Sequence, residues 1–304
     1  MMTRLTLTCL YLAIAVSPAA ALDLGQIPDT NRWVLHVDTQ RAMSGALGDW
    51  YAKLRRNPTA DARLQLLENL SGVTFANDIH SITLTGIDNR EDQVAVIIHG
   101  QFQPERLTTL ARAANAYQAL AHNAHQVHHW KDDGKNHYAA IVGTNTLIVA
   151  GYQAPVQRIL DTIDQGAGSL ATDPSFADMA NATATIVAGV ADGVDQWQGL
   201  RPRARLLQEV DRIRVTIDEA GDAMVLNLTV TAKQLEKAEQ MQQVVQGLIA
   251  LYGLGHDQID DQNVVRLLRS LAVKRDGATV TITTTYPTGI LLQALANKIG
   301  VTIE

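Results

Sequence analysis

The chain has 304 residues and carries 25 Lys and Arg against 31 Asp and Glu, a formal net charge of −6. This acidic balance argues against a polyanionic partner, because affinity for nucleic acid requires clustered Lys and Arg. One local basic cluster has no interleaved aromatic side chains, and we expect it to be a solvated surface: Arg201, Arg203, Arg205, Arg212 and Arg214.

Residues 1–21 have the pattern of a cleavable export signal. Arg4 supplies the positive start, and an apolar run from Leu5 to Val16 follows. Ser17-Pro18 ends the run, and the small residues after it place the cleavage site after Ala21. As a helix the run would span only about 18 Å, too short for a bilayer core. We therefore predict that the signal is removed and that the mature protein is periplasmic or secreted.

The predicted leader also contains the only cysteine, Cys9. A cysteine-free mature chain would have no disulfide, no thiolate metal site and no cysteine nucleophile. With 46% hydrophobic residues, the chain can still bury a substantial core. No later stretch is apolar enough to predict a transmembrane segment in the mature chain.

In the first half, alternation and helical periodicity predict strands, paired by turns, and helices that follow them. Asn57-Pro58 separates two of the helices. The predicted order is a strand at Trp33 to Asp38, helices at about Thr39 to Arg55 and Thr59 to Leu70, a hairpin of Ser81 to Ile87 with Gln93 to Phe102, a helix from Pro104, a hairpin of His125 to Lys131 with His137 to Val142, a strand at Thr146 to Gly151, and a helix from about Ala154 to Asp164.

The second half repeats this order with an offset near 131 residues, which indicates a weak internal duplication. An acidic turn joins its first hairpin, and Asp276-Gly277 is a strong turn signal for its second. The predicted order is a strand at Ala184 to Asp192, a hairpin of Arg212 to Ile217 with Ala223 to Thr231, a helix from Lys233 to about Tyr252, a hairpin of Leu271 to Arg275 with Ala278 to Tyr286, and a helix from Thr288 to Ile299.

Adjacent strands joined by tight turns must be antiparallel, and helices grouped after hairpins cover a sheet. We therefore predict an α+β protein of two similar domains, each an antiparallel sheet with helices packed on one face. Gly166 and Gly168 mark the linker, which gives a signal peptide at 1–21, a first domain at 22–168 and a second at 169–304.

The stretch after the linker carries a family resemblance. Ser169 to Phe176 reads SLATDPSF, and a strand at Ala184 to Asp192 follows it. With the hairpin-helix block that contains Phe102, Pro104 and Leu107, this organisation resembles a loose group of uncharacterised exported bacterial proteins of the domain-of-unknown-function type. The resemblance implies a duplicated α+β exported protein with no assigned activity and no transferable functional residues. That group often carries a membrane helix, where this chain has a leader.

Five of the nine histidines lie between His122 and His137, and neutral imidazole is the commonest metal ligand. A turn centred on Gly134 would pair Lys131 with His137 and would make His129 and His137 same-face diagonal neighbours, about 7 Å apart. The predicted metal ligands are therefore His129 and His137. Side chains that could assist them are Asp132, Asp133 and His125. No cofactor is predicted, and Zn²⁺ or Cu²⁺ would suit this site; the alternative is a row of polar histidines on a solvated sheet face.

No phosphate-binding loop and no serine nucleophile elbow is present in the sequence. The leading hypothesis is a soluble, exported, non-enzymatic protein that binds an envelope protein or another envelope component, with no nucleic acid as partner. A second hypothesis is metal binding or buffering by the segment from His122 to His137. A third is a hydrolase whose Ser, His and Asp side chains converge only in the fold.

Overall fold

The computed structural model describes residues 22–165, 168–197, 207–254 and 262–298. The predicted leader with its cleavage site, Gly166 of the predicted linker, and Arg201, Arg203 and Arg205 of the basic cluster lie outside these residues. Among the described helices, none combines the length and the hydropathy needed to cross a bilayer.

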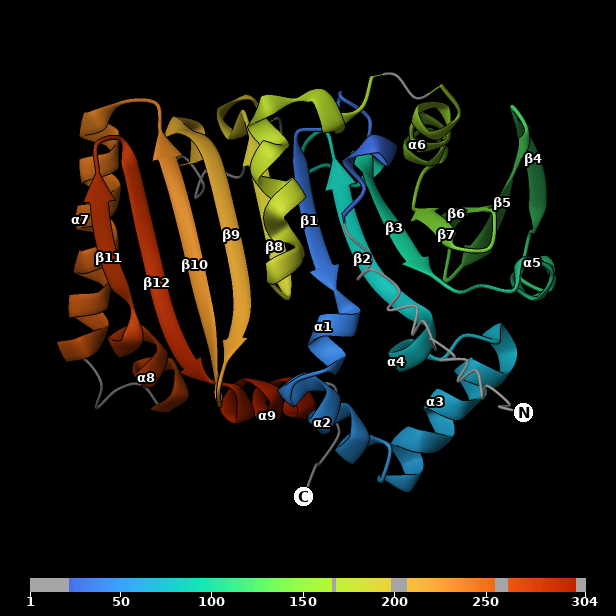
Figure 1. The fold of residues 1–304 in the computed structure, drawn as a ribbon, viewed down its shortest axis with the longest axis horizontal. Helices are drawn as coiled ribbons and strands as arrows, with labels where there is room; N and C mark the ends of the chain where they lie inside the picture. Colours follow the sequence, from blue (N-terminus) through green and yellow to red (C-terminus); the bar gives the residue numbers. More distant parts are fainter. Residues whose placement is uncertain (1–21, 166–167, 198–206, 255–261, 299–304) are drawn as a thin grey trace, which may run out of the picture.

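One antiparallel sheet of 12 strands runs through the described chain, in the order β11-β12-β10-β9-β8-β1-β2-β3-β7-β6-β5-β4 (Figure 1). The strands are β1 (Trp33–Asp38), β2 (Ile79–Gly86), β3 (Val94–Gly100), β4 (Gln118–His122), β5 (His125–Asp132), β6 (Lys135–Val142), β7 (Thr146–Ala150), β8 (Val187–Asp192), β9 (Val210–Ala220), β10 (Ala223–Ala232), β11 (Ala272–Asp276) and β12 (Thr279–Pro287).

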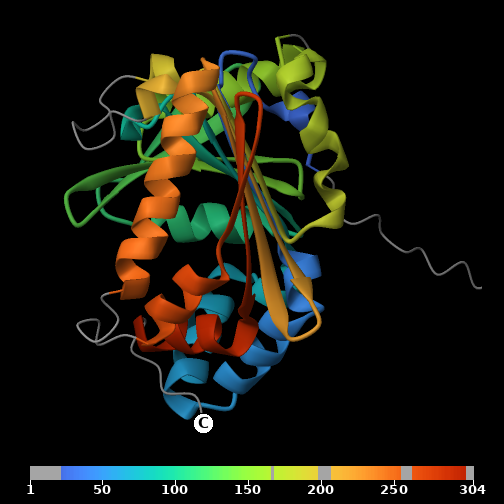
Figure 2. The same cartoon turned by 90° about the vertical axis from the view of Figure 1, so that its left-hand side faces the viewer.

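Helices occupy both faces and one end of this sheet (Figures 1 and 2). The α-helices are α1 (Thr39–Met43), α2 (Ala46–Leu54), α3 (Pro58–Ser71), α4 (Phe75–Asp78), α5 (Pro104–Arg112), α6 (Gln153–Gln165), α7 (Leu235–Leu254), α8 (Gln262–Ser270) and α9 (Thr288–Lys298). Short 3-10 helices are η1 (Leu24–Gln26), η2 (Glu91–Gln93), η3 (Leu170–Thr172), η4 (Pro174–Ala184) and η5 (Val194–Gln196).

Local signals in the sequence fix several of these elements. The first predicted strand is confirmed as β1. The predicted break at Asn57-Pro58 is also confirmed: the Asn57 side chain accepts hydrogen bonds from the backbone N–H groups of Thr59 and Ala60, and so caps α3. The helix predicted before this break is instead two helices, because the chain turns at Gly45. There the Glu219 carboxylate accepts from the Ala46 N–H at 3.0 Å.

The two halves of the chain meet inside the sheet rather than as separate sheets. β1 pairs with β8 in antiparallel register, from Trp33 opposite Ala191 to Val37 opposite Val187. The strand order on one side of this pair is β1-β2-β3-β7-β6, and on the other side β8-β9-β10-β12-β11, with β5 and β4 added only to the first. The division of the chain into two domains therefore stays a prediction, within a mixed α and β fold that has one large antiparallel sheet.

The main hydrophobic core lies on one face of the sheet, which we call the α6 face. Here Ile97, Val127 and Ile148 pack against Leu160 of α6 and Phe176 of η4, all of them buried. A second, smaller core forms on the opposite face, where Ala238 and Met241 of α7 cover strands of the second half. Figure 2 shows α7 and η4 on opposite sides of the sheet.

The prediction that helices cover a single face of each sheet is wrong for the first half. α6 covers the side of β5, β6 and β7 that carries Val127, Ala140 and Ile148. α5 lies over the other side, against Ile141 and Leu147. The physical reason is that these strands are apolar on both faces, so each face must be covered.

The face opposite α6, which we call the pocket face, is apolar almost across its whole width. Register pairing joins one residue from each strand into a single row on this face. Its members are Val273, Ile282, Leu228, Val215, Gly189, Leu35, Leu84, Val96, Val149, Ala139, His128 and Ala119. At its centre a Cβ on Gly189 would lie 2.9 Å from both Leu35 Cδ1 and Val215 Cγ1, so any larger residue here would displace these side chains.

Candidate functional site

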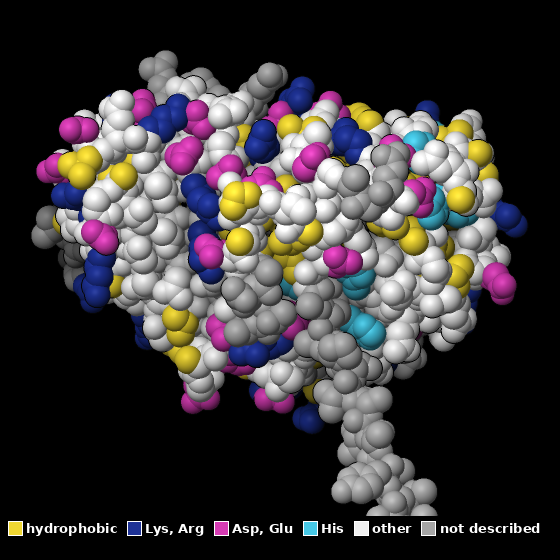
Figure 3. Space-filling model, turned by 45° about the horizontal axis from the view of Figure 1, so that its top comes forward, with side chains coloured by type: hydrophobic (Ala, Val, Ile, Leu, Met, Phe, Trp, Pro, Cys, Tyr) yellow, Lys and Arg dark blue, Asp and Glu magenta, His cyan; other side chains and the backbone are white. Residues whose placement is uncertain are grey.

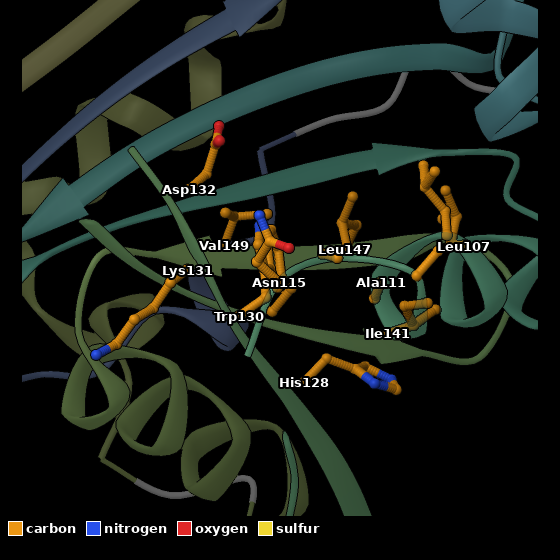
Figure 4. Close-up of a pocket in the computed structure, with 14 residues that line it drawn as sticks. Leu107, Ala111, Asn115, His128, Trp130, Lys131, Asp132, Ile141, Leu147 and Val149 are labelled. Atoms are coloured by element: carbon orange, nitrogen blue, oxygen red, sulfur yellow. The ribbon is translucent and has the colours of Figure 1, made fainter. Parts of the chain in front are cut away.

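A pocket of about 490 Å³ lies on the pocket face, between α5 and strands β5, β6 and β7 (Figure 4). Its lining combines one face of a helix with three strands and the loop after α5. The lining residues are Leu107, Leu110, Ala111, Ala113, Ala114, Asn115, His128, Trp130, Lys131, Asp132, Ala139, Ile141, Leu147 and Val149.

Sequence periodicity explains why these side chains meet. α5 begins with Pro104 at its first position, which fixes the start of the helix. Leu107, Leu110 and Ala111 then follow at steps of three and four, and so share one helical face. Alternate residues of each strand point to the same side of the sheet, and the strands therefore present a matching apolar floor.

No residue of α5 is buried, although the helix lies over the sheet. Leu110 is 40% exposed, and a second, open hollow of about 850 Å³ lies on the far side of the helix, lined by Leu70, Phe102 and Arg106 among others. Both hollows share Leu110 and Ala113. α5 thus spans an apolar space without filling it.

One polar side chain is built into the pocket wall. His128 is only 4% exposed, and its Nδ1 lies 2.9 Å from the hydroxyl of Tyr117. The two rings also stack, with centroids 5.9 Å apart. Burial, and then the positive charge of Arg112, lower the pKa of His128, so the imidazole is neutral near pH 7.

The other polar residues of the lining either hold its elements together or direct their side chains away from its apolar part. The backbone N–H of Lys131 donates to the carbonyl of Asn115 at 2.9 Å and ties the loop after α5 to β5. Figure 4 shows the Lys131 side chain directed away from the apolar residues, and Asp132 on the opposite side of the lining from His128. Trp130 stacks on His137 at a centroid distance of 5.5 Å.

The hairpin with the predicted metal ligands has a different register from the one predicted. Trp130 pairs with His137 and His129 pairs with Tyr138, one residue away from the predicted alignment. The shift follows from a two-residue turn at Asp133 and Gly134, whose φ angles are +46° and +75°. The predicted register is therefore wrong.

This register places His129 and His137 on opposite faces of the sheet. His129 stacks on Tyr138 and its Nε2 lies 3.1 Å from Asn136 Oδ1. Asp132 and Asp133 are exposed. Within the described ranges, no three His, Cys, Asp or Glu side chains are grouped so that they could hold a metal ion.

His125, the third side chain predicted to assist the metal ligands, instead contacts an acidic residue of α6. Its Nε2 lies 2.8 Å from Asp164 of α6, and His122 Nε2 lies 2.8 Å from Asp161. These two pairs fasten the edge hairpin of β4 and β5 to α6. Figure 3 shows histidine side chains beside acidic ones at the right of the visible face, and shows Lys and Arg interspersed with Asp and Glu elsewhere on it.

A row of polar side chains on the α6 face resembles the set that a hydrolase would require. Asp38, Ser81 and His99 are register partners on β1, β2 and β3. Asp38, however, caps α1 by accepting from the Arg41 N–H at 2.8 Å, and His99 Nε2 lies 3.1 Å from Gln26 Oε1. The Ser81 hydroxyl is buried with no hydrogen-bond partner in the described structure. These contacts do not form a relay from serine through histidine to aspartate.

Sequence reasoning missed the pocket, the place of His128 in its lining, and the hydrogen-bond partner of His128, Tyr117. The strand β4, which brings Tyr117 beside His128, was not predicted, because QALAH lacks β-branched and aromatic residues. The available signals were the apolar spacing of Leu107, Leu110 and Ala111, and the apolar character of both faces of β7.

Comparison with known proteins gives a fold and no activity. No family model and no curated protein matches the sequence. A solved structure of the protein TP0453, in its crystal form III, is similar with a TM-score of 0.52 at 8% identity, covering 91% of this chain and 99% of that one. Crystal form IV of the same protein gives a TM-score of 0.47 at 8% identity, over 91% and 98%. At this identity, the likeness to form III shows a shared fold alone.

Proposed function

We propose that the protein is an exported, non-enzymatic binding protein whose ligand is an amphipathic component of the cell envelope. The observation that carries this proposal is the pocket between α5 and β5–β7, with its apolar lining and one buried polar side chain. Ligand pockets commonly enclose about 300 to 1,000 Å³ and combine apolar walls with a few convergent polar groups.

The packing of α5 supports a binding role for this space. A helix that only completed a core would bury the apolar side chains that face the sheet, as α7 does with Ala238 and Met241. Leu107 and Leu110 of α5 instead face an unfilled space, so an apolar ligand would gain burial there at about 25 cal/mol for each Å² removed from water.

Export and the choice of an envelope component rest on the sequence. Residues 1–21 predict a cleaved signal, and the resemblance to exported bacterial proteins favours the same compartment. N-terminal sequencing of the protein recovered from the periplasm and the medium tests this directly. We expect a first residue of Leu22, and recovery of the intact chain in the cytosol would contradict export.

We also propose that the two halves are related by an internal duplication. Support comes from the strand order, in which β1-β2-β3-β7-β6 matches β8-β9-β10-β12-β11 across the β1–β8 pair. β4 and β5 interrupt the correspondence, and β5 forms one wall of the pocket. On this proposal, ligand binding belongs to the half that gained the extra hairpin.

Binding can be tested with the fluorescent probe N-phenyl-1-naphthylamine, which brightens in apolar surroundings. We expect the mature protein to bind the probe and Ile141→Trp, which fills the pocket, to bind it at least tenfold more weakly. Val244→Trp is the matched control, because Val244 lies on the exposed side of α7, outside the pocket. Equal affinity of the two variants would overturn the proposed site.

A further inference from the structure

His128 is the feature of the pocket that its apolar surroundings do not explain. It is the one polar member of the twelve-residue row that crosses the pocket face. Its neighbours across the strands, Ala119 and Ala139, are small and apolar. Burying a polar ring in this position costs free energy unless its nitrogen atoms find partners.

Tyr117 satisfies only one of the two ring nitrogens. Its hydroxyl lies 2.9 Å from Nδ1, and this is the sole hydrogen bond of the His128 ring among the described residues. When the phenol donates to Nδ1, the proton of the neutral imidazole resides on Nε2. The ring then presents an N–H donor at the pocket wall.

The charges around the pocket favour an acceptor with negative charge at this end. Arg112 ends α5, and after burial its positive charge is the second cause that lowers the pKa of His128. Asp132 belongs to the same lining but lies on the opposite side of it (Figure 4). The positive charge of Arg112 would therefore attract an anion towards His128.

The apolar side chains continue directly from this polar end. Figure 4 shows His128 at the edge of a group that contains Ile141, Leu147 and Leu107. We propose that the pocket binds a single-chain amphiphile with a carboxylate head, the carboxylate accepting the Nε2–H of His128 near Arg112 and the chain lying along Ile141, Leu147 and Leu107. This inference rests on the proposed function and adds the chemical class of the ligand.

The test compares dodecanoate with dodecanol, which share the chain and differ in the head. Displacement of N-phenyl-1-naphthylamine at pH 7.5 reports both affinities on the mature protein. We expect wild type to prefer dodecanoate by about tenfold, since hydrogen bonds to charged groups contribute more than those to neutral ones. His128→Phe keeps an aromatic ring, and should lose this preference while it still binds dodecanol.

Two further variants separate recognition of the head from a general loss of structure. Tyr117→Phe removes only the hydroxyl that holds Nδ1, and should reduce the preference for dodecanoate. His137→Phe is the matched control, because His137 stacks on the lining residue Trp130 but does not itself line the pocket, and should leave the preference unchanged. Circular dichroism confirms that each variant is folded.

The possible failures are distinguishable. Equal affinity of wild type for dodecanoate and dodecanol would overturn the carboxylate inference and leave the binding pocket intact. A preference that survives His128→Phe would overturn the assignment to His128. Failure of wild type to bind the probe, dodecanoate and dodecanol would overturn the proposed function itself.

Discussion

Two helices on the pocket face, α5 and α7, each follow a hairpin, but they differ in how many side chains they bury against the sheet. α7 follows the β9–β10 hairpin, has 20 residues, and buries Ala238 and Met241 against the sheet. α5 follows the β2–β3 hairpin, has 9 residues, and buries none. The comparison teaches that one arrangement of hairpin and helix can build a core or a pocket, depending on how completely the helix covers its strands.

The largest expected effect is a difference in unfolding free energy between substitutions in α7 and in α5. Met241→Ala should lower the free energy of unfolding by about 3 kcal/mol, because it leaves a cavity in a packed core. Leu107→Ala should lower it by about 1 kcal/mol or less, since Leu107 already borders an unfilled space and its loss creates little new cavity. Urea unfolding of both variants measures the difference, and equal losses would contradict this account of α5.

The second effect is a loss of folding stability at low pH. It should be confined to the first half, because all described histidines lie there. Burial lowers the pKa of His36 to about 4, against the opposing effect of Asp38 and with a contribution from His99. The unfolded chain takes up this proton below about pH 6.5 and the folded protein does not. Stability is therefore lost as the pH falls through this window.

Between pH 7 and pH 5 the loss from His36 should be about 2 kcal/mol. Urea unfolding at both pH values measures it, and His36→Gln should reduce the difference because glutamine does not titrate. Hydrogen exchange at pH 5 should show earlier opening of β1 and β2 than of β10 and β12. Uniform opening across the sheet would contradict a half-specific effect.

A smaller effect concerns the contact between the halves at the start of α2. Glu219→Gln keeps the size of the side chain but weakens its acceptance of the Ala46 N–H, and should cost about 1 kcal/mol. Asp222→Asn is the control, because Asp222 lies on the turn that joins β9 to β10 and is exposed. Equal stability of the Glu219 variant and wild type in urea would show that this cap does not matter.

The smallest effect concerns the edge hairpin. His122→Ala removes the contact with Asp161 and should speed hydrogen exchange in β4 without altering α7. The global stability should change little, because the contact is partly exposed and such surface contacts contribute weakly. Unchanged exchange in β4 would show that pairing with β5 alone holds this edge.

Sequence patterns predicted the local structure better than the site. Turn chemistry and periodicity identified β1, the break at Asn57, and the hairpin at Gly277, because these depend on neighbouring residues. The pairing of β1 with β8 joins residues far apart in the chain, and no local signal specifies it. The same limit applies to the pocket, whose walls come from α5 and three strands.

The histidine segment shows how one residue of register changes a functional prediction. Gly134 was correctly placed in a turn, but the φ of +46° at Asp133 makes the loop shorter than assumed. Since side chains alternate along a strand, a shift of one residue places His129 and His137 on opposite faces of the sheet instead of on the same face. A two-residue Asp-Gly loop was the available signal, and it favoured the observed register.

The central position of β1 has a consequence for how the molecule is made. One edge of β1 pairs with β2, but the other must wait for Val187 to Ala191, which the ribosome adds about 150 residues later. Until then β1 is an unpaired, apolar edge strand, which can pair with strands of other chains. We therefore expect the first half expressed alone to aggregate. A chaperone that covers the unpaired edge of β1 during synthesis or transport should raise the yield of the full chain.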